Sequence, residues 1–365
     1  MRIAILGTRG IPNNYGGFEQ FAEYLSKGLV EMGHEVWVYS GDDHVYQEKT
    51  WEGVNIIHKK NPEDKIGTAG QFIYDFFCVM DSRKRRFDII LQLGYTSNSV
   101  WGRLLPGRPV IITNMDGLEW KRSKFSAKVR RFLKYAEKLA VKTSDFLIAD
   151  SIGIQSYLKS TYNKHAEYIP YGTNVALSPD RKVLADFAVQ PYHYNMLIAR
   201  MEPENNIETI LNGVVASNES SPMLVIGNVT NTFGKYLVSK FERESRIKFL
   251  GPNYDIHALN SLRYFSNVYF HGHSVGGTNP SLLEAMGSGA LICAHQNEFN
   301  SAILGTDAFY FTDATSVAEL LNKKIDKQTH TAFVESNLKK IDRYYRWPLI
   351  INAYEAFFRK VAKSK

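Results

Sequence analysis

The sequence predicts an α/β protein made of two doubly wound domains that face each other across a cleft. Apolar, β-branched segments alternate with longer segments of helical periodicity along most of the 365 residues. About thirteen strand segments occur, which is more than one twisted open sheet usually holds. The alternation therefore favours two parallel sheets, each covered by helices on both faces.

The strand segments fall into two series. The first comprises 3–6, 35–39, 54–58, 87–93, 110–113, 146–149 and 167–169. The second comprises 196–199, 224–226, 247–250, 268–270, 291–294 and 309–311. Segments with helical periodicity, such as 18–32 and 126–142, lie between them. The domain boundary is expected in the polar stretch 170–194, which contains several prolines.

Composition excludes several classes of protein. Hydrophobic residues make up 44% and charged residues 22%, as in globular proteins. The most apolar stretch, 72–80, contains Asp75, and no run approaches the ~20 apolar residues of a membrane span. The chain starts directly in a strand, without the pattern of a signal peptide. Cys78 and Cys293 lie far apart in apolar contexts, so we expect reduced thiols and a cytoplasmic protein.

The basic residues are concentrated in one segment. The net charge is +7, and nine Lys or Arg residues lie at positions 121, 122, 124, 128, 130, 131, 134, 138 and 142, with Glu137 as the one acid among them. Apolar residues recur there at helical spacing: Phe125, Val129, Phe132, Leu133, Ala136 and Leu139. This pattern predicts a basic amphipathic helix. Its cationic face is either a solvated surface or a contact for anionic lipid, and no nucleic-acid-binding motif accompanies it.

The loop after the first strand is rich in glycine. Its glycines lie at 7, 10, 16 and 17, which does not match the Gly-x-Gly-x-x-Gly pattern of a dinucleotide site. Gly16 and Gly17, just before a predicted helix, would let backbone amides approach an anion or a sugar. The alternative is a connection whose glycines only shape the turn.

A second candidate site follows the strand 196–199, where Arg200 begins the sequence Arg-Met-Glu-Pro-Glu-Asn-Asn. A guanidinium group at the end of a strand suits a diphosphate because its fork donates paired, charge-assisted hydrogen bonds. The alternative is a surface ion pair between Arg200 and Glu202 or Glu204.

The third candidate site is the glycine-rich segment 271–289. Asn279 is placed to cap a helix that begins with Pro280, and the free amides of that helix start would bind an anion. Glu284, about one turn along, would accept hydrogen bonds from a ribose, although it is alternatively a solvated helical glutamate. His271 and His273 lack a third ligand for zinc, and the chain has no Asp-x-Asp pair for a metal-bound diphosphate, so no metal is expected.

Together these motifs resemble those of retaining glycosyltransferases of family 4, which have the two-domain GT-B fold. The resemblance rests on the Gly-Gly loop, the Arg-x-x-Pro-Glu motif and the Gly-rich turn before Leu-Leu-Glu-Ala-Met-x-x-Gly, and it covers essentially the whole chain. More narrowly, the segments 7–19, 116–122 and 274–280 are similar to a bacterial branch that includes β-1,4-rhamnosyltransferases of capsule and cell-wall polysaccharide assembly.

The resemblance implies a division of the chain into three parts. Residues 1–172 would form an acceptor-side Rossmann-like domain and residues 190–344 a Rossmann-like domain that binds the nucleotide sugar. Residues 345–365 would form a helix that crosses back to the first domain. Two departures stand out: Gly276 replaces a glutamate that usually contacts the donor sugar, and Asn205 replaces a lysine of the diphosphate site.

The resemblance also implies roles for individual residues. Arg200 and Asp116 are the candidate catalytic residues, with a helix cap as the alternative role of Asp116. The donor's diphosphate and ribose are expected to contact Arg200, Asn205, Asn279, Ser281, Leu282 and Glu284. The sugar and acceptor are expected to contact Arg9, Gly16, Gly17, Gly276, Gly277 and Thr278.

The implied reaction transfers L-rhamnose from dTDP-rhamnose, without metal or other cofactor, to a lipid-linked saccharide at the inner face of the cell membrane. Two alternatives remain at this point. One is a UDP-hexose or UDP-N-acetylhexosamine transferase of the same family, and the other is a non-catalytic protein that binds sugar nucleotides. A nucleotide-sugar epimerase or dehydrogenase would need the dinucleotide fingerprint that this chain lacks.

Overall fold

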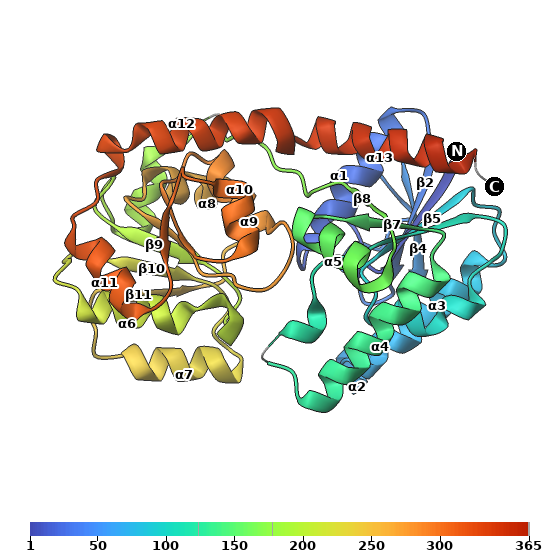
Figure 1. The fold of residues 1–365 in the computed structure, drawn as a ribbon, viewed down its shortest axis with the longest axis horizontal. Coiled ribbons are helices and arrows are strands. Elements are labelled where there is room, and N and C mark those ends of the chain that lie inside the picture. Colours follow the sequence, from blue (N-terminus) through green and yellow to red (C-terminus); the bar gives the residue numbers. More distant parts are fainter. Residues whose placement is uncertain (123, 177, 364–365) are drawn as a thin grey trace. The chain divides into compact units, whose positions relative to one another are not determined.

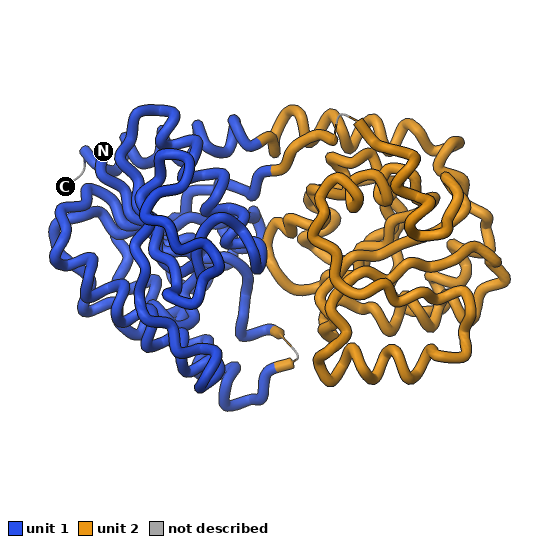
Figure 2. Tube along the Cα trace, turned by 180° about the vertical axis from the view of Figure 1, so that it is seen from behind, with its two compact units in different colours: residues 1–121, 125–172, 347–365 blue, residues 122–124, 173–346 orange. Residues whose placement is uncertain are grey.

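The computed structural model describes residues 1–122, 124–176 and 178–363, so the predicted ranges 121–142, 170–194 and 345–365 each include residues outside the described part. The described chain divides into two compact units, which are coloured separately in Figure 2. Unit 1 consists of Met1–Lys121, Phe125–Gly172 and Trp347–Lys365, and unit 2 of Arg122–Lys124 and Thr173–Arg346.

Unit 1 is built on an eight-stranded sheet in the order β3-β4-β2-β1-β5-β6-β7-β8. Its strands are β1 (Arg2–Leu6), β2 (Glu35–Gly41), β3 (Thr50–Trp51), β4 (Val54–Lys59), β5 (Ile89–Leu93), β6 (Val110–Asn114), β7 (Phe146–Ala149) and β8 (Ala166–Tyr168). All paired strands are parallel except β3, which pairs antiparallel with β4. The sequence did not predict β3, because a strand of two residues is too short to show alternation.

Helices flank this sheet (Figure 1). They are α1 (Gly17–Glu31), α2 (Glu63–Ile66), α3 (Ala69–Ser82), α4 (Ala127–Thr143), α5 (Ile152–Tyr162) and α13 (Trp347–Ala362). The predicted helices 18–32 and 126–142 are confirmed as α1 and α4. Ser126 caps α4, since its hydroxyl accepts a hydrogen bond from the amide of Val129.

Unit 2 is built on six parallel strands in the order β11-β10-β9-β12-β13-β14. They are β9 (Asn195–Ile198), β10 (Met223–Ile226), β11 (Ile247–Gly251), β12 (Tyr269–His271), β13 (Ile292–His295) and β14 (Phe309–Phe311). The helices are α6 (Ile207–Ala216), α7 (Thr232–Phe241), α8 (Ile256–Phe265), α9 (Pro280–Gly287), α10 (Glu298–Leu304), α11 (Ala314–Asn322) and α12 (Thr331–Lys340). The prediction of two parallel, doubly wound sheets is confirmed.

Both sheets reverse their strand order beside their first strand. In unit 1 the reversal lies between β1 and β5, and in unit 2 between β9 and β12. Connections leave to opposite faces at such a point, and doubly wound sheets generally bind ligands in the crevice that it marks at the carboxyl ends of the strands. Three of the predicted motifs follow β1, β9 and β12.

The last helix, α13, packs on α1 within unit 1, as predicted (Figure 1). Trp347 stacks on Tyr24, with ring centroids 4.5 Å apart and planes at 7°. His34 Nε2 lies 3.1 Å from a carboxylate oxygen of Glu355. At Gly28, a Cβ would lie 2.6 Å from Ile351, so this glycine lets the two helices approach closely.

We expect Trp347→Ala to lower the free energy of unfolding of unit 1 by about 3–5 kcal/mol, because it removes a large buried side chain and leaves a cavity. Chemical denaturation followed by circular dichroism measures the change. Leu349→Ala is the matched control, since Leu349 is 43% exposed on the same helix. Equal stabilities of the two variants would contradict the assigned role of Trp347.

Candidate functional site

The loop after β9 is a tight turn built around the carbonyl oxygen of Arg200. The amide of Glu202 and the side-chain amide of Asn205 both donate to it, at 2.8 Å each. Arg200 itself is exposed, whereas Asn205 is buried. The sequence predicted that Asn205 contacts the donor. In the structure, its side chain donates a hydrogen bond to the Arg200 carbonyl oxygen within the loop. Asn205 therefore holds the turn from which the Arg200 side chain extends.

This loop is joined to the loop after β12 across the crevice of unit 2. Ser274 donates to the carbonyl oxygen of Glu204 from its amide at 3.1 Å and from its hydroxyl at 2.8 Å. Asn206 Nδ2 donates to the carbonyl oxygen of Gly272 at 2.8 Å. A Cβ at Gly272 would lie 2.0 Å from the Asn205 carbonyl oxygen, so only glycine fits there. Two motifs that are distant in sequence thus form one site.

The two acids that follow Arg200 pair with other cations. Glu202 lies 3.1 Å from Lys124 Nζ, and an oxygen of Glu204 lies 3.6 Å from an Arg122 nitrogen. The alternative from the sequence, a surface ion pair between Arg200 and one of these acids, is therefore not what the structure shows. Sequence analysis missed Arg122 as a member of this site, because some 80 residues separate it from the motif that it joins.

Two histidines lie at the end of β12. Their rings stack, with centroids 4.5 Å apart and planes at 13°. His271 is buried, and burial lowers its pKa well below the usual range. Burial lowers the pKa of His273 to about 3, with further contributions from the positive charges of Arg200 and Arg122. Both rings are therefore neutral at physiological pH. Within the described residues, no group of three or more His, Cys, Asp or Glu side chains is arranged to hold a metal ion.

Helix α9 begins as predicted, with Asn279 as its cap and Pro280 at its first position. The amides at its start already have partners, however. The Ser281 amide donates to Asn279 Oδ1 at 3.0 Å, and the Leu282 amide donates to the Asn279 carbonyl oxygen at 3.1 Å. In this structure, the side chain of Asn279 accepts the first of these bonds and its backbone carbonyl oxygen the second. The contacts of Asn279, Ser281 and Leu282 with the donor stay a prediction.

Glu284 of α9 is paired with a buried arginine. Its carboxylate accepts a hydrogen bond from Arg263 at 2.6 Å, and the Arg263 side chain is 1% exposed and also donates to Asn260. The alternative of a solvated glutamate is therefore wrong. The Glu284 side chain keeps 21% exposure. Arg263 fixes the position of this carboxylate. The pair could not be predicted, because its one signal in the sequence is a single arginine in a largely apolar helix.

The remaining predicted residues of unit 2 lie in the loop between β12 and α9. Gly276 has φ +137°, a conformation that favours glycine, and no atom lies within 4 Å of where its Cβ would be. A glutamate at this position would therefore be strained although not crowded. Gly277 and Thr278 are buried.

In unit 1, Arg9 lies in the loop after β1 and is held from two sides. Its guanidinium donates to both carboxylate oxygens of Glu63, at 3.0 and 2.7 Å, and lies 3.9 Å from the ring centroid of Tyr15. The buried Glu19 accepts a hydrogen bond from the Arg9 amide at 2.9 Å. Gly16 precedes α1 with an extended backbone (φ −169°), and Gly17 is the first residue of that helix.

Asp116 follows β6 at the same edge of the sheet and is partly buried. Its charge is one of the contributions that raise the pKa values of Tyr171 and Tyr354, for which burial is the main cause. The next turn, Glu119–Lys121, is held by Tyr95, whose hydroxyl donates to the Gly117 carbonyl oxygen at 3.1 Å. Unit 1 thus brings Arg9, Gly16 and Asp116 to one edge of its sheet.

A buried aspartate lies beside this edge and was not predicted as a site residue. Asp75 of α3 accepts a hydrogen bond from the Ser97 hydroxyl, at 2.5 Å, in the chain segment after β5. Burial raises the pKa of Asp75 to about 7, although the hydrogen bond opposes that shift. The only sequence signal was an acid in the middle of an apolar helix.

Glu137 is the centre of a polar cluster on α4. Its side chain is 1% exposed and accepts hydrogen bonds from Trp120 Nε1, Lys134 Nζ, Tyr157 and Tyr162. Lys134 also lies over the Trp120 and Tyr157 rings, 4.5 and 4.6 Å from their centroids. The cluster fixes the turn at 119–121 against α4 and α5. It also pairs Lys134 of the predicted cationic surface with an acid, although the Lys134 side chain keeps 37% exposure.

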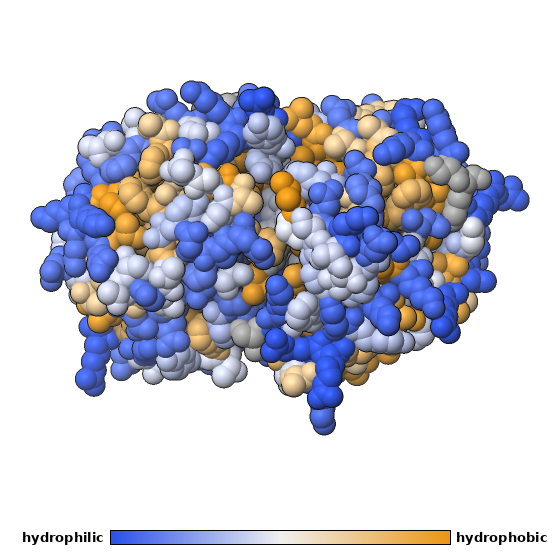
Figure 3. All heavy atoms as spheres, viewed as in Figure 1, coloured by the Kyte–Doolittle hydropathy of each residue, from blue (hydrophilic) through white to orange (hydrophobic). Residues whose placement is uncertain are grey.

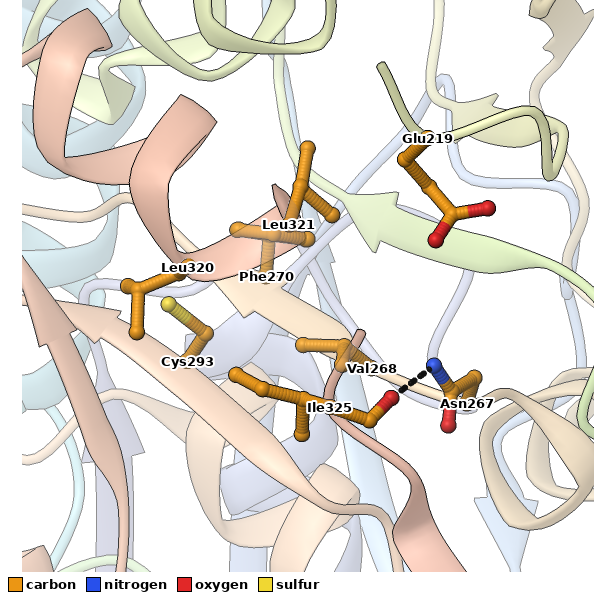
Figure 4. Close-up of a pocket in the computed structure, with 8 residues that line it drawn as sticks. All are labelled: Glu219, Asn267, Val268, Phe270, Cys293, Leu320, Leu321 and Ile325. Carbon is orange, nitrogen blue, oxygen red and sulfur yellow. Dashed lines mark hydrogen bonds between the residues drawn. The ribbon is translucent and has the colours of Figure 1, made fainter. Parts of the chain in front are cut away.

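A small pocket lies elsewhere in unit 2 (Figure 4). Its lining is mostly apolar and includes Val268, Phe270, Cys293 and Leu321. Asn267 and Val268 precede β12, so the pocket adjoins the amino end of that strand rather than the crevice at the carboxyl ends. It is not part of the candidate site.

Two doubly wound units with a returning C-terminal helix define the GT-B fold. The chain is similar to sucrose-phosphate synthase from Thermosynechococcus elongatus, at TM-score 0.82 and 15% identity over 100% of both chains. It is also similar to HepE of Anabaena in complex with UDP and glucose, at TM-score 0.75 and 16% identity over 98% of this chain and 99% of that one. A glycosyltransferase from Rickettsia africae matches at TM-score 0.71 and 14% identity, over 100% and 99%.

The comparisons by sequence are less extensive. Residues 104–174 match the model of a domain of unknown function, DUF1972. This match spans β6, α4, β7, α5 and β8, and so includes Asp116, Arg122 and the Glu137 cluster. No curated protein matches the chain.

We expect Asp75→Asn to stabilise the protein more at pH 8 than at pH 5. The pKa of Asp75 is about 7 in the fold and about 3.9 in an unfolded chain. The folded state therefore binds the proton more tightly, and the stability from this group, fully present below pH ~3.9, is lost as the pH rises to about 7. Asparagine still accepts from Ser97 and has no charge to bury.

The measurement is the melting temperature of both proteins between pH 5 and pH 8. Asp64→Asn, at an exposed position, is the control and should show no such trend. If the difference in melting temperature between Asp75→Asn and the wild type stays constant over this range, Asp75 does not titrate as described.

Proposed function

We propose that this protein is a retaining glycosyltransferase that transfers a sugar from a nucleotide donor to a saccharide acceptor. The observation that supports this most strongly is the joining of the Arg200 loop to the Gly-rich loop at the β9–β12 crevice, through Ser274 and Glu204. Sugar nucleotides carry a diphosphate, which suits an exposed guanidinium at such a crevice. The likeness to a HepE structure that holds UDP and glucose agrees with this proposal.

In the proposed reaction, the bond between the anomeric carbon and the diphosphate oxygen breaks, and the acceptor oxygen bonds to the same face of that carbon. The acceptor's proton passes to the departing phosphate oxygen, so no side-chain nucleophile is required. The protein acts by positioning and by stabilising the charge on the diphosphate. Arg200 stabilises that charge, and Glu284, oriented by Arg263, binds the ribose hydroxyls. No metal is invoked, in line with the missing Asp-x-Asp pair.

Unit 1 is proposed to bind the acceptor and the reacting sugar. Asp116 and Arg9 supply polar groups at the edge of its sheet, and Gly16 and Gly17 let the backbone approach a saccharide. The pairing of Arg9 with Glu63 orients its guanidinium beside Tyr15, and aromatic and guanidinium groups together suit an uncharged sugar ring.

For the donor we propose dTDP-L-rhamnose. The support is the sequence resemblance, together with the open space beside Gly276, where other family members have a glutamate. The specific alternative is a UDP-sugar, which the UDP complexes of HepE favour. A non-catalytic sugar-nucleotide-binding protein remains the third candidate, and turnover distinguishes it from the first two.

The acceptor is proposed to be lipid-linked and the protein to bind the inner face of the cell membrane through α4. The helix has an outer stripe of exposed residues at helical spacing, Lys128, Arg131, Tyr135, Lys138 and Lys142. Hydrophilic side chains gather over this region in Figure 3. No helix of the described residues is long and apolar enough to cross a bilayer. Such a stripe attracts anionic lipid, at about 1 kcal/mol per cation.

We expect the wild-type protein to be stabilised selectively by dTDP among dTDP, UDP, GDP, ADP and NAD, without added metal. A ligand at about 100 times its dissociation constant contributes ~2.7 kcal/mol, which a thermal-shift assay detects.

We expect Arg200→Ala to reduce turnover of dTDP-rhamnose by about two orders of magnitude, because it removes stabilisation of the departing charge.

The matched control is Arg243→Ala, which removes an exposed arginine of the same unit. A selective rise in melting temperature with UDP would support a glycosyltransferase that uses a UDP-sugar instead of dTDP-rhamnose. Stabilisation by NAD alone, or by no nucleotide, would refute the transferase. Normal turnover in Arg200→Ala would remove Arg200 from the mechanism.

We also expect replacement of Lys128, Arg131, Lys138 and Lys142 by serine to weaken binding to vesicles that contain anionic lipid by at least tenfold. Wild-type binding should fall as salt rises, since the Debye length shortens to ~3 Å at 1 M. Co-sedimentation measures both effects, with zwitterionic vesicles as the control. Binding that ignores both salt and lipid charge would exclude an electrostatic contact through α4.

A further inference from the structure

A second guanidinium lies at the crevice of unit 2 besides that of Arg200. The segment Arg122–Lys124 belongs to this unit, although the residues on both sides of it belong to unit 1. Within unit 2, Arg122 approaches Glu204 to 3.6 Å and Lys124 approaches Glu202 to 3.1 Å. The loop that begins with Arg200 is therefore bordered by cations that the sequence places far from it.

The positive charges of Arg122 and Arg200 both affect the pKa of His273. Both positive charges lower the pKa of His273 at the end of β12, after the larger effect of burial. Both charges therefore oppose protonation of the His273 ring, which stacks on that of His271. Because those histidines are neutral, they leave the positive charge at this edge to the two arginines.

The contact between Arg122 and Glu204 is weak in its geometry. At 3.6 Å it is too long for a hydrogen bond, and within the described residues neither carboxylate oxygen of Glu204 has a hydrogen-bond partner, although the residue is only 5% exposed. Its carbonyl oxygen, by contrast, is held firmly by Ser274. Arg122 therefore faces Glu204 as a neighbouring charge rather than as its hydrogen-bond donor, and a phosphate, to which a guanidinium donates paired hydrogen bonds, would make the stronger contact.

Asn205 is uncharged, and its side-chain amide donates a hydrogen bond to the carbonyl oxygen of Arg200. A nucleoside diphosphate brings two or more negative charges, and Arg200 alone neutralises one of them. We propose that Arg122 is the second cation that binds the donor's diphosphate, donating to the phosphate oxygens while its charge stays beside Glu204. This inference rests on the proposed function and assigns to that site a residue from outside the Arg-x-x-Pro-Glu motif.

The test is isothermal titration of dTDP and UDP, with the matching uncharged nucleosides as probes of the base and ribose contacts. We expect Arg122→Ala to weaken diphosphate binding about 10- to 100-fold, the equivalent of one lost charge-assisted contact, and to leave nucleoside binding unchanged. Arg122→Lys should recover part of the affinity. Arg131→Ala, which removes an exposed arginine of α4, is the matched control and should bind like wild type.

Glu204→Gln separates this role from a purely structural ion pair. It keeps the shape of the side chain and removes the competing charge, so we expect diphosphate binding as tight as in wild type or tighter. If the pair is structural, Glu204→Gln will instead lower the melting temperature and weaken binding as Arg122→Ala does, which overturns the proposal.

The outcomes also separate this inference from the proposed function. Wild-type protein that binds neither diphosphate would refute the proposed function itself. Wild-type protein that binds one of them while Arg122→Ala binds it equally well would refute only the role of Arg122.

Discussion

Two hydrogen bonds from Ser274 to the carbonyl oxygen of Glu204 hold together the loops after β9 and β12, and the candidate donor site depends on them. Without them, the reversal of strand order would only send two loops in different directions. With them, and with the bond from Asn206 to Gly272, the Arg200 turn and the start of α9 share one rigid edge. Glycine at 272 is a consequence, because no side chain fits between the two loops.

The acids of unit 2 around this edge each have a cation beside them. Glu284 is paired with the buried Arg263, Glu202 with Lys124, and Glu204 is buried beside Arg122. The two histidines are neutral because burial and the neighbouring arginines oppose protonation. Arg200 is exposed at the centre. An anion at this edge would therefore meet the positive charge of Arg200.

In unit 1, the buried carboxylate of Glu137 organises one side of the basic helix α4. It turns Lys134 inward among Trp120, Tyr157 and Tyr162 and thereby orders the turn that leads to Arg122. The other cations of the outer stripe remain exposed.

Local features of the sequence determined the element types, the two parallel sheets and the Asn279 cap, because each follows from periodicity or from capping chemistry. The return of the last helix was implied by the resemblance to a known family. Arg200 and Gly276 were predictable as site residues because they lie in loops that follow strands of a parallel sheet, where such sheets bind ligands. Only the tertiary structure decided the partners of the charges. Arg122 with Glu204, Arg263 with Glu284 and Lys134 with the aromatic rings join residues from different elements, and the capped amides of α9 depend on one rotamer of Asn279. An ion pair depends on distance in space, which spacing along the chain does not fix.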